Sequence, residues 1–107
     1  MISLIPKGNK WEVEKNYQVS VLNTTIKIKK GFVSDLASIP RIMWFILPPF
    51  GRYTEASVVH DYLYFNAELP RKKCDEIFFI LMLRNNVDYY TAKILFYTVR
   101  LFGWMYY

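Results

Sequence analysis

Cysteine and histidine are nearly absent from this sequence. Its 107 residues include one of each, Cys74 and His60. A single cysteine excludes a disulfide within the chain, and such cysteine usage is typical of a protein that works in a reducing compartment. One cysteine and one histidine also do not provide the several thiolate and imidazole ligands of a closed zinc site.

Long uniform runs are missing as well. The longest apolar run, residues 77–83, is seven residues long, whereas a membrane-spanning helix needs roughly twenty. No run of like charge reaches the roughly five or six residues that mark a nucleic-acid-binding arm. The first residues have neither a basic region nor a long apolar stretch, so we predict no signal peptide and no transmembrane segment.

Hydrophobic and aromatic residues, in contrast, are abundant. The chain is 53% hydrophobic and 19% aromatic, with nine Tyr, eight Phe and three Trp. This composition excludes disorder. It also exceeds what a core of this size must bury, so we expect some aromatic side chains to be exposed for a partner protein or a membrane contact. The net charge of +5 suits an anionic partner such as nucleic acid, phospholipid or an acidic protein, but it is weak evidence by itself, and a solvated basic surface is the favoured explanation.

The length predicts one domain over residues 1–107, mainly β in 1–35 and mainly α in 54–103. Apolar and polar residues alternate in the first third, with a turn predicted at Asn23–Thr24. A proline-bearing stretch follows, in which residues 43–47 are interpreted as one helical turn.

Three helices are predicted in the second half. The first runs from Thr54 to about Phe65, the second from Pro70 to Arg84, and the third over 89–102 after an Asp88 cap and before Gly103. We therefore predict an α+β fold, in which a small N-terminal antiparallel sheet packs on a helical hairpin with a third, C-terminal helix.

The predicted helical hairpin would bring the single histidine close to a carboxylate. His60 and Asp75 lie about equally far on either side of the turn at residues 66–69. If the two helices are antiparallel, the imidazole and the carboxylate face one another. A histidine held in one tautomer by a carboxylate is the arrangement of a general base. A lone histidine on an apolar helix face is equally typical of a hydrogen-bonded core residue, and both interpretations stay open.

Two further carboxylates suggest a metal. Asp61 follows His60 on the helix and so points to different neighbours, and Asp35 lies in a loop with free backbone carbonyls. Carboxylates, carbonyls and water are the oxygen ligands that Ca²⁺ prefers. Arg41 and Arg52 could instead form ion pairs with these carboxylates and remove the metal site altogether.

The order Asp35-Leu36, His60-Asp61, Asp75 resembles the small prokaryotic and fungal secreted phospholipases A2. In that family an Asp-Leu loop gives a carboxylate and a carbonyl to calcium. One helix carries a His-Asp pair followed by a tyrosine, and an antiparallel helix carries the Asp that pairs with the histidine. The resemblance covers roughly residues 32–82. It implies His60 and Asp75 as catalytic residues and Asp35, Leu36 and Asp61 as calcium ligands. The disulfides and the glycine-rich calcium loop of related enzymes are absent.

A second resemblance covers most of the chain. The segments GFVSDLASIP (31–40) and PPFGRY (48–53), with His60-Asp61 and Asp75, are similar to a family of short phage and prophage proteins of uncharacterised function. This resemblance implies location in the host cytoplasm or the virion.

Three functions follow as hypotheses. The first is a phage accessory protein that binds a host or virion protein through exposed aromatics and keeps the phospholipase-like His-Asp core. The second is a calcium-dependent ester hydrolase that acts on phospholipid, with His60 as general base. The third, ranked last, is nucleic-acid binding, because Phe96, Tyr97 and Phe102 are interpreted as packing residues rather than a stacking platform for bases.

Overall fold

The computed structural model describes residues 2–7, 10–34 and 54–102. These residues form five strands and three helices: β1 (Leu4–Lys7), β2 (Lys10–Val13), β3 (Tyr17–Val21), β4 (Thr24–Ile28), β5 (Val33–Ser34), α1 (Thr54–Asn66), α2 (Arg71–Arg84) and α3 (Tyr89–Phe102). The fold is α+β, as predicted, with the strands first and the helices after them.

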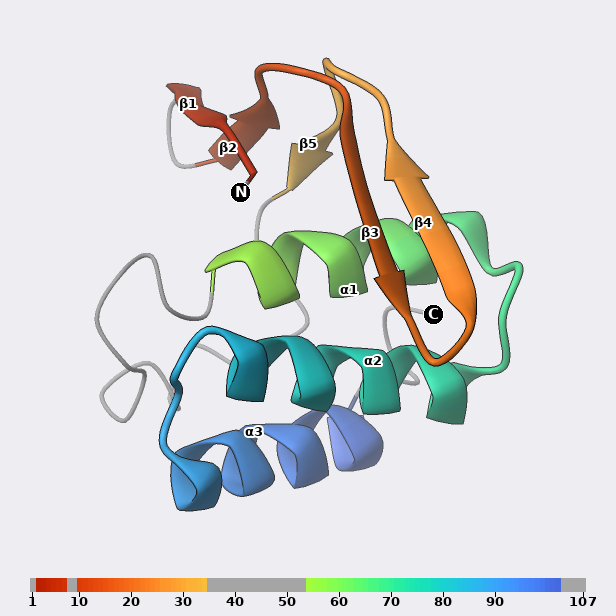
Figure 1. The fold of residues 1–107 in the computed structure, drawn as a ribbon, viewed down its shortest axis with the longest axis vertical. Coiled ribbons are helices and arrows are strands. Elements are labelled where there is room, and N and C mark those ends of the chain that lie inside the picture. The colour runs from red at the N-terminus through yellow and green to blue at the C-terminus, as the bar shows by residue number, and fades with distance from the viewer. Residues whose placement is uncertain (1, 8–9, 35–53, 103–107) are drawn as a thin grey trace.

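The strands pair in two antiparallel sheets. One has the order β1-β2-β5, and the other is the hairpin β3-β4. Residues Trp11 and Ser34 are paired across β2 and β5, so the chain returns to the first sheet after making the hairpin. The hairpin therefore leaves that sheet and is free to lie on the helices (Figure 1).

The hairpin turn lies one residue earlier than predicted. Its central residues are Leu22 and Asn23, with φ of 51° and 61°, and Thr24 already belongs to β4. Two successive left-handed residues match the right-handed twist of the flanking strands. The prediction of a turn at Asn23–Thr24 was wrong by this one step, because the twist of the strands selects the turn residues.

The helix bounds agree closely with the predictions. One difference is Pro70, which precedes α2 as its N-cap, with φ of −56° and ψ of 143°, rather than opening the helix. The Asp88 cap is confirmed, because its Oδ2 accepts hydrogen bonds from the backbone N–H groups of Tyr90 and Thr91. The predicted helical turn at 43–47 and the stop at Gly103 lie outside the described residues.

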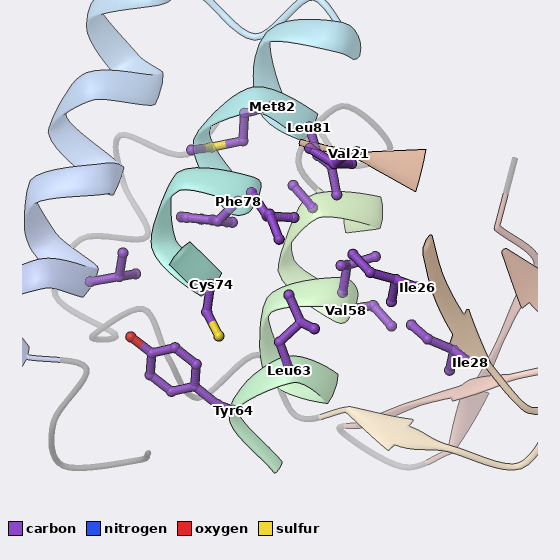
Figure 2. Packing of buried hydrophobic residues seen from close by; sticks show 14 of the residues in the cluster. Val21, Ile26, Ile28, Val58, Leu63, Tyr64, Cys74, Phe78, Leu81 and Met82 are labelled. Carbon is purple, nitrogen blue, oxygen red and sulfur yellow. The ribbon is translucent and has the colours of Figure 1, made fainter. Parts of the chain in front are cut away.

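The three helices are antiparallel neighbours in chain order, and the β3-β4 hairpin lies across α1 and α2 (Figure 1). Inward-facing strand residues such as Val21, Ile26 and Ile28 meet Val58, Phe78 and other helix residues in one buried cluster (Figure 2). The packing of α2 between α1 and α3 buries both sides of α2. Among the described residues, no helix is long and apolar enough to cross a membrane.

Candidate active site

The centre of the candidate site is the predicted pair of His60 and Asp75. His60 lies on α1 and Asp75 on α2, and the Nε2 atom of His60 is 2.7 Å from Oδ1 of Asp75. Both side chains are fully buried. The antiparallel packing of α1 on α2 thus brings together two residues that are fifteen positions apart, as the symmetry about the turn predicted.

Asp75 accepts hydrogen bonds from two other helix residues. The hydroxyl of Tyr64, one turn after His60, donates to Oδ1 at 2.5 Å. The guanidinium of Arg100, on α3, donates to Oδ2 at 2.9 Å. Arg71, one turn before Asp75, has its Nε 3.9 Å from Oδ2 and donates through Nη2 to the Arg100 carbonyl. One buried carboxylate therefore links all three helices.

These partners keep Asp75 ionised. Burial by itself raises the pKa of this carboxyl, but the hydrogen bonds from His60, Tyr64 and Arg100 outweigh burial, and the pKa lies below its ordinary value. Burial raises the pKa of the Tyr64 hydroxyl, and its hydrogen bond to Asp75 raises it further, so Tyr64 remains a donor. An ionised carboxylate only accepts hydrogen bonds, so Nε2 of His60 must carry the proton that it shares with Asp75.

The other ring nitrogen of His60 is therefore a proton acceptor in the neutral imidazole. This atom, Nδ1, is buried and has no hydrogen-bond partner among the described residues. The ring itself is held by neighbouring aromatic rings, with centroids 4.2 Å from Tyr64 and 4.8 Å from Phe78. Ser57, one turn earlier on α1, has a buried Oγ that is also unpaired. A buried unpaired acceptor costs free energy, and it is the feature that a general base requires.

Of the three predicted calcium ligands, the structure describes Asp61. This residue is half-buried, and its Oδ2 accepts a hydrogen bond from the Ser34 hydroxyl at the end of β5. Asp35 follows Ser34 directly in the chain, but Asp35, Leu36, Arg41 and Arg52 lie outside the described residues. In the described part of the chain, no group of three or more His, Cys, Asp or Glu side chains could hold a metal. An oxygen-rich donor set of Asp35, Leu36 and Asp61 still suits Ca²⁺ chemically.

Sequence reasoning missed three contributors to this site. Tyr64 could have been identified, because it lies four residues after His60 and so on the same helix face. Arg100 carried no local signal, since its contact with Asp75 depends on how α3 packs. Ser34 likewise reaches Asp61 only through the pairing of β5 with β2. One packing prediction was also wrong: Tyr97 is 53% exposed, because the face of α3 on which it lies points away from α2.

The fold and the site define a small α+β protein with a buried histidine–carboxylate pair at the junction of three helices. A family model described as "protein of unknown function (DUF1353)" matches residues 11–99, and the chain belongs to this family. The matched region includes His60, Tyr64 and Asp75. No curated protein and no solved structure matches the chain.

Proposed function

We propose that the protein is an ester hydrolase in which His60 is the general base, with phospholipid as the substrate class and calcium as the cofactor. The observation that supports this proposal concerns the two ring nitrogens of His60. Nε2 is hydrogen-bonded to Asp75, whereas Nδ1 is buried and has no hydrogen-bond partner among the described residues. A histidine kept only as scaffold gains nothing from an unpaired nitrogen, which costs about 1–3 kcal/mol. The hydrolase therefore fits the geometry better than a protein that keeps the His-Asp core merely as support for a binding surface.

The proposed reaction uses one water. Nδ1 of His60 accepts a proton from this water while the water oxygen attacks the ester carbonyl. The resulting imidazolium is stabilised by Asp75, which Tyr64 and Arg100 hold in place. His60 then returns the proton to the leaving alcohol oxygen as the ester bond breaks, so the products are a carboxylic acid and an alcohol. No acyl-enzyme forms, and the step needs no serine nucleophile.

Calcium is proposed for two reasons: the resemblance to secreted phospholipases A2 implies it, and the oxygen donors of Asp35, Leu36 and Asp61 suit it chemically. Asp61 and Asp35, with the Leu36 carbonyl, would hold the ion, which when bound supplies positive charge for the phosphate and for the developing oxyanion. Binding has a readout apart from activity. Millimolar CaCl₂ is expected to raise the Tm of the protein, because a ligand that binds only the folded state stabilises it. Asp61→Asn should remove most of this increase, and a Tm that calcium leaves unchanged contradicts the site.

Hydrolysis is tested by the release of fatty acid from phospholipid vesicles, with CaCl₂ or with EGTA. We expect the full-length protein to hydrolyse the ester with calcium, and His60→Gln to lose about 10²–10⁴-fold in rate while its circular dichroism spectrum stays unchanged. Tyr17→Phe is the matched control and should retain activity, because Tyr17 is also a buried tyrosine but its hydroxyl donates to Glu55 rather than to Asp75. A wild-type protein that is inactive on both anionic and zwitterionic lipids would overturn the proposal and favour the protein-binding hypothesis.

Access to the base can be measured separately. His60 is 0% exposed, so a substrate reaches Nδ1 only when the surrounding structure opens. Diethyl pyrocarbonate modifies unprotonated imidazole nitrogen, and the single histidine makes its reaction unambiguous. We expect native protein to react measurably, and more slowly than unfolded protein. A histidine that reacts only at the rate of global unfolding would identify His60 as a core residue.

A further inference from the structure

The outer face of α3 is apolar, although it faces solvent. Its large exposed side chains are Tyr90, Ile94, Tyr97 and Leu101, with exposed fractions of 75%, 48%, 53% and 67%. Their spacing of four, three and four residues places them in one stripe along the helix. The opposite face, with Ala92, Leu95 and Val99, is fully buried. The helix is thus apolar on both sides, which is unusual for a helix at the surface of a soluble domain.

The charged residues of α3 are all basic. The helix sequence YYTAKILFYTVRLF contains Lys93 and Arg100 and no acidic residue. The Nζ atom of Lys93 lies between two aromatic rings, 5.3 Å from the Tyr89 centroid and 5.9 Å from the Tyr97 centroid. Its hydrogen bond from Nζ to the Tyr89 hydroxyl raises the pKa of Lys93, so the side chain is charged at neutral pH.

A second basic group lies at the C-terminal end of the stripe. Because α2 and α3 are antiparallel, the first turn of α2 lies beside the last turn of α3, and the Arg71 guanidinium contacts the Arg100 carbonyl. That first turn continues with Lys72 and Lys73 and has no acidic residue. An apolar stripe flanked by cations and tyrosines is the pattern of a helix that lies in the interface of an anionic membrane. Tyrosine suits this position because its ring is apolar and its hydroxyl is polar.

We propose that the outer face of α3 docks the protein on an anionic phospholipid surface, with Ile94 and Leu101 in the acyl region and the lysines Lys93, Lys72 and Lys73 near the headgroups. A second copy of the chain fits the face less well, because α3 carries basic residues and no acidic residue, so two α3 faces would bring like charges together. The proposal extends the proposed function by naming the surface that meets the substrate layer. Arg100 lies in the last turn of α3, and its guanidinium donates a hydrogen bond to Asp75. The helix that carries the docking face therefore also contacts the candidate active site.

Docking can be measured without catalysis. The full-length His60→Gln protein is mixed, in EDTA, with vesicles of phosphatidylcholine alone or with an equal share of phosphatidylglycerol, and bound protein is separated by sedimentation. We expect binding to the mixed vesicles, weaker binding to phosphatidylcholine alone, and loss of binding as salt is raised. Ile94→Glu with Leu101→Glu should weaken the partition by at least about tenfold, because apolar burial drives insertion.

Phe65→Glu is the matched control, because Phe65 is 77% exposed but lies at the end of α1 rather than on α3. This variant should bind like its parent. Circular dichroism confirms that each variant is folded, and Tyr90→Gln with Tyr97→Gln is a second test of the same face should the glutamate pair not fold.

Three outcomes would overturn the docking proposal: no binding to mixed vesicles, binding that neither α3 pair weakens, or a dimer in sedimentation equilibrium that the α3 changes dissociate, which would assign the face to a second copy. Hydrolysis is assayed apart from docking, on a short-chain ester dissolved as monomers. If the protein hydrolyses the short-chain ester but does not bind vesicles, the docking proposal is rejected and the hydrolase proposal is not. Vesicle binding without activity on any ester rejects the hydrolase alone.

Discussion

Two tyrosine–carboxylate clusters lie at opposite ends of α1, and they differ in one respect. Near its start, Glu55 accepts hydrogen bonds from the Tyr17 hydroxyl at 2.5 Å and from the Asn85 amide at 2.9 Å. Toward its end, the Tyr64 hydroxyl donates to Asp75 at the same 2.5 Å. Burial raises the pKa of both tyrosines, and the hydrogen bonds to the carboxylates add to this. The same hydrogen-bonded pair thus joins secondary-structure elements at both ends.

The difference is what each cluster leaves unpaired. In the described part of the chain, the buried side-chain atoms without a hydrogen-bond partner are Ser57 Oγ, His60 Nδ1 and Arg71 Nε. None belongs to the Glu55 cluster, and the last two belong to residues that contact Asp75. The Glu55 cluster is a satisfied link between β3 and the ends of two helices. The Asp75 cluster provides the same link and also contains a buried ring nitrogen, Nδ1 of His60, that has no hydrogen-bond partner among the described residues.

The largest expected difference between the clusters is in stability. Asp75→Asn leaves His60 and Arg100 without a charged partner in a buried site, and we expect it to lower the free energy of unfolding by about 3–5 kcal/mol. Glu55→Gln keeps the side-chain length at a half-buried site and should cost about 1–3 kcal/mol. Urea denaturation of both variants measures the difference. Equal costs would mean that the Asp75 cluster is no more demanding than the Glu55 cluster.

Acid should weaken the Asp75 cluster in a defined direction. The pKa of Asp75 is lowered in the folded protein, so its ionised form contributes stability that is fully present above the unfolded carboxyl pKa of about 3.9. This contribution is lost as the pH falls through the folded pKa. Urea midpoints measured from about pH 6 to about pH 3 should therefore fall less steeply for Asp75→Asn than for the wild type. Parallel curves for the two proteins would show that Asp75 is not the group responsible.

Removal of the tyrosine hydroxyls separates structure from chemistry. Tyr64→Phe and Tyr17→Phe each delete one hydrogen bond to a carboxylate, and each should cost about 1.5–3 kcal/mol of stability. Only Tyr64→Phe should also lower the rate of ester hydrolysis, because Tyr64 holds the carboxylate that orients His60. The paired measurement of thermal unfolding and fatty-acid release tests this. If both variants lose activity in proportion to stability, Tyr64 has no role beyond packing.

The smallest effect concerns the single thiol, which lies beside Asp75 in the chain. Burial raises the pKa of Cys74 to about 11, so native protein should react slowly with a thiol reagent such as Ellman's reagent. Asp75→Asn is expected to speed labelling under native conditions, because it loosens the helix junction around Cys74. Glu55→Gln should leave the labelling rate close to that of the wild type. The same acceleration in both variants would indicate global rather than local opening.

Local sequence patterns determined much of the secondary structure of this protein. The helical stripes, the Asp88 cap and the alternation in β3 and β4 are set by neighbours within a few residues, so the helix bounds and the strand faces followed from the sequence. The His60–Asp75 contact followed as well, because a short turn between antiparallel helices places equidistant residues opposite one another. The position of Tyr64 could also have been predicted, because it lies one helical turn after His60 on the same face of α1.

Only the tertiary structure decided the rest, because it depends on contacts between distant segments. β2 pairs with β5 across the hairpin, and this pairing divides the strands into two sheets and brings Ser34 to Asp61. Arg100 reaches Asp75 through the packing of α3 on α2, and the same packing decides which face of α3 is left outside. The apolar residues of α3 are visible in the sequence, but periodicity does not say which apolar stripe of a helix is buried. That choice is made by the partner that covers one stripe, and here α2 covers the stripe of Ala92, Leu95 and Val99 and leaves Tyr90, Ile94, Tyr97 and Leu101 exposed.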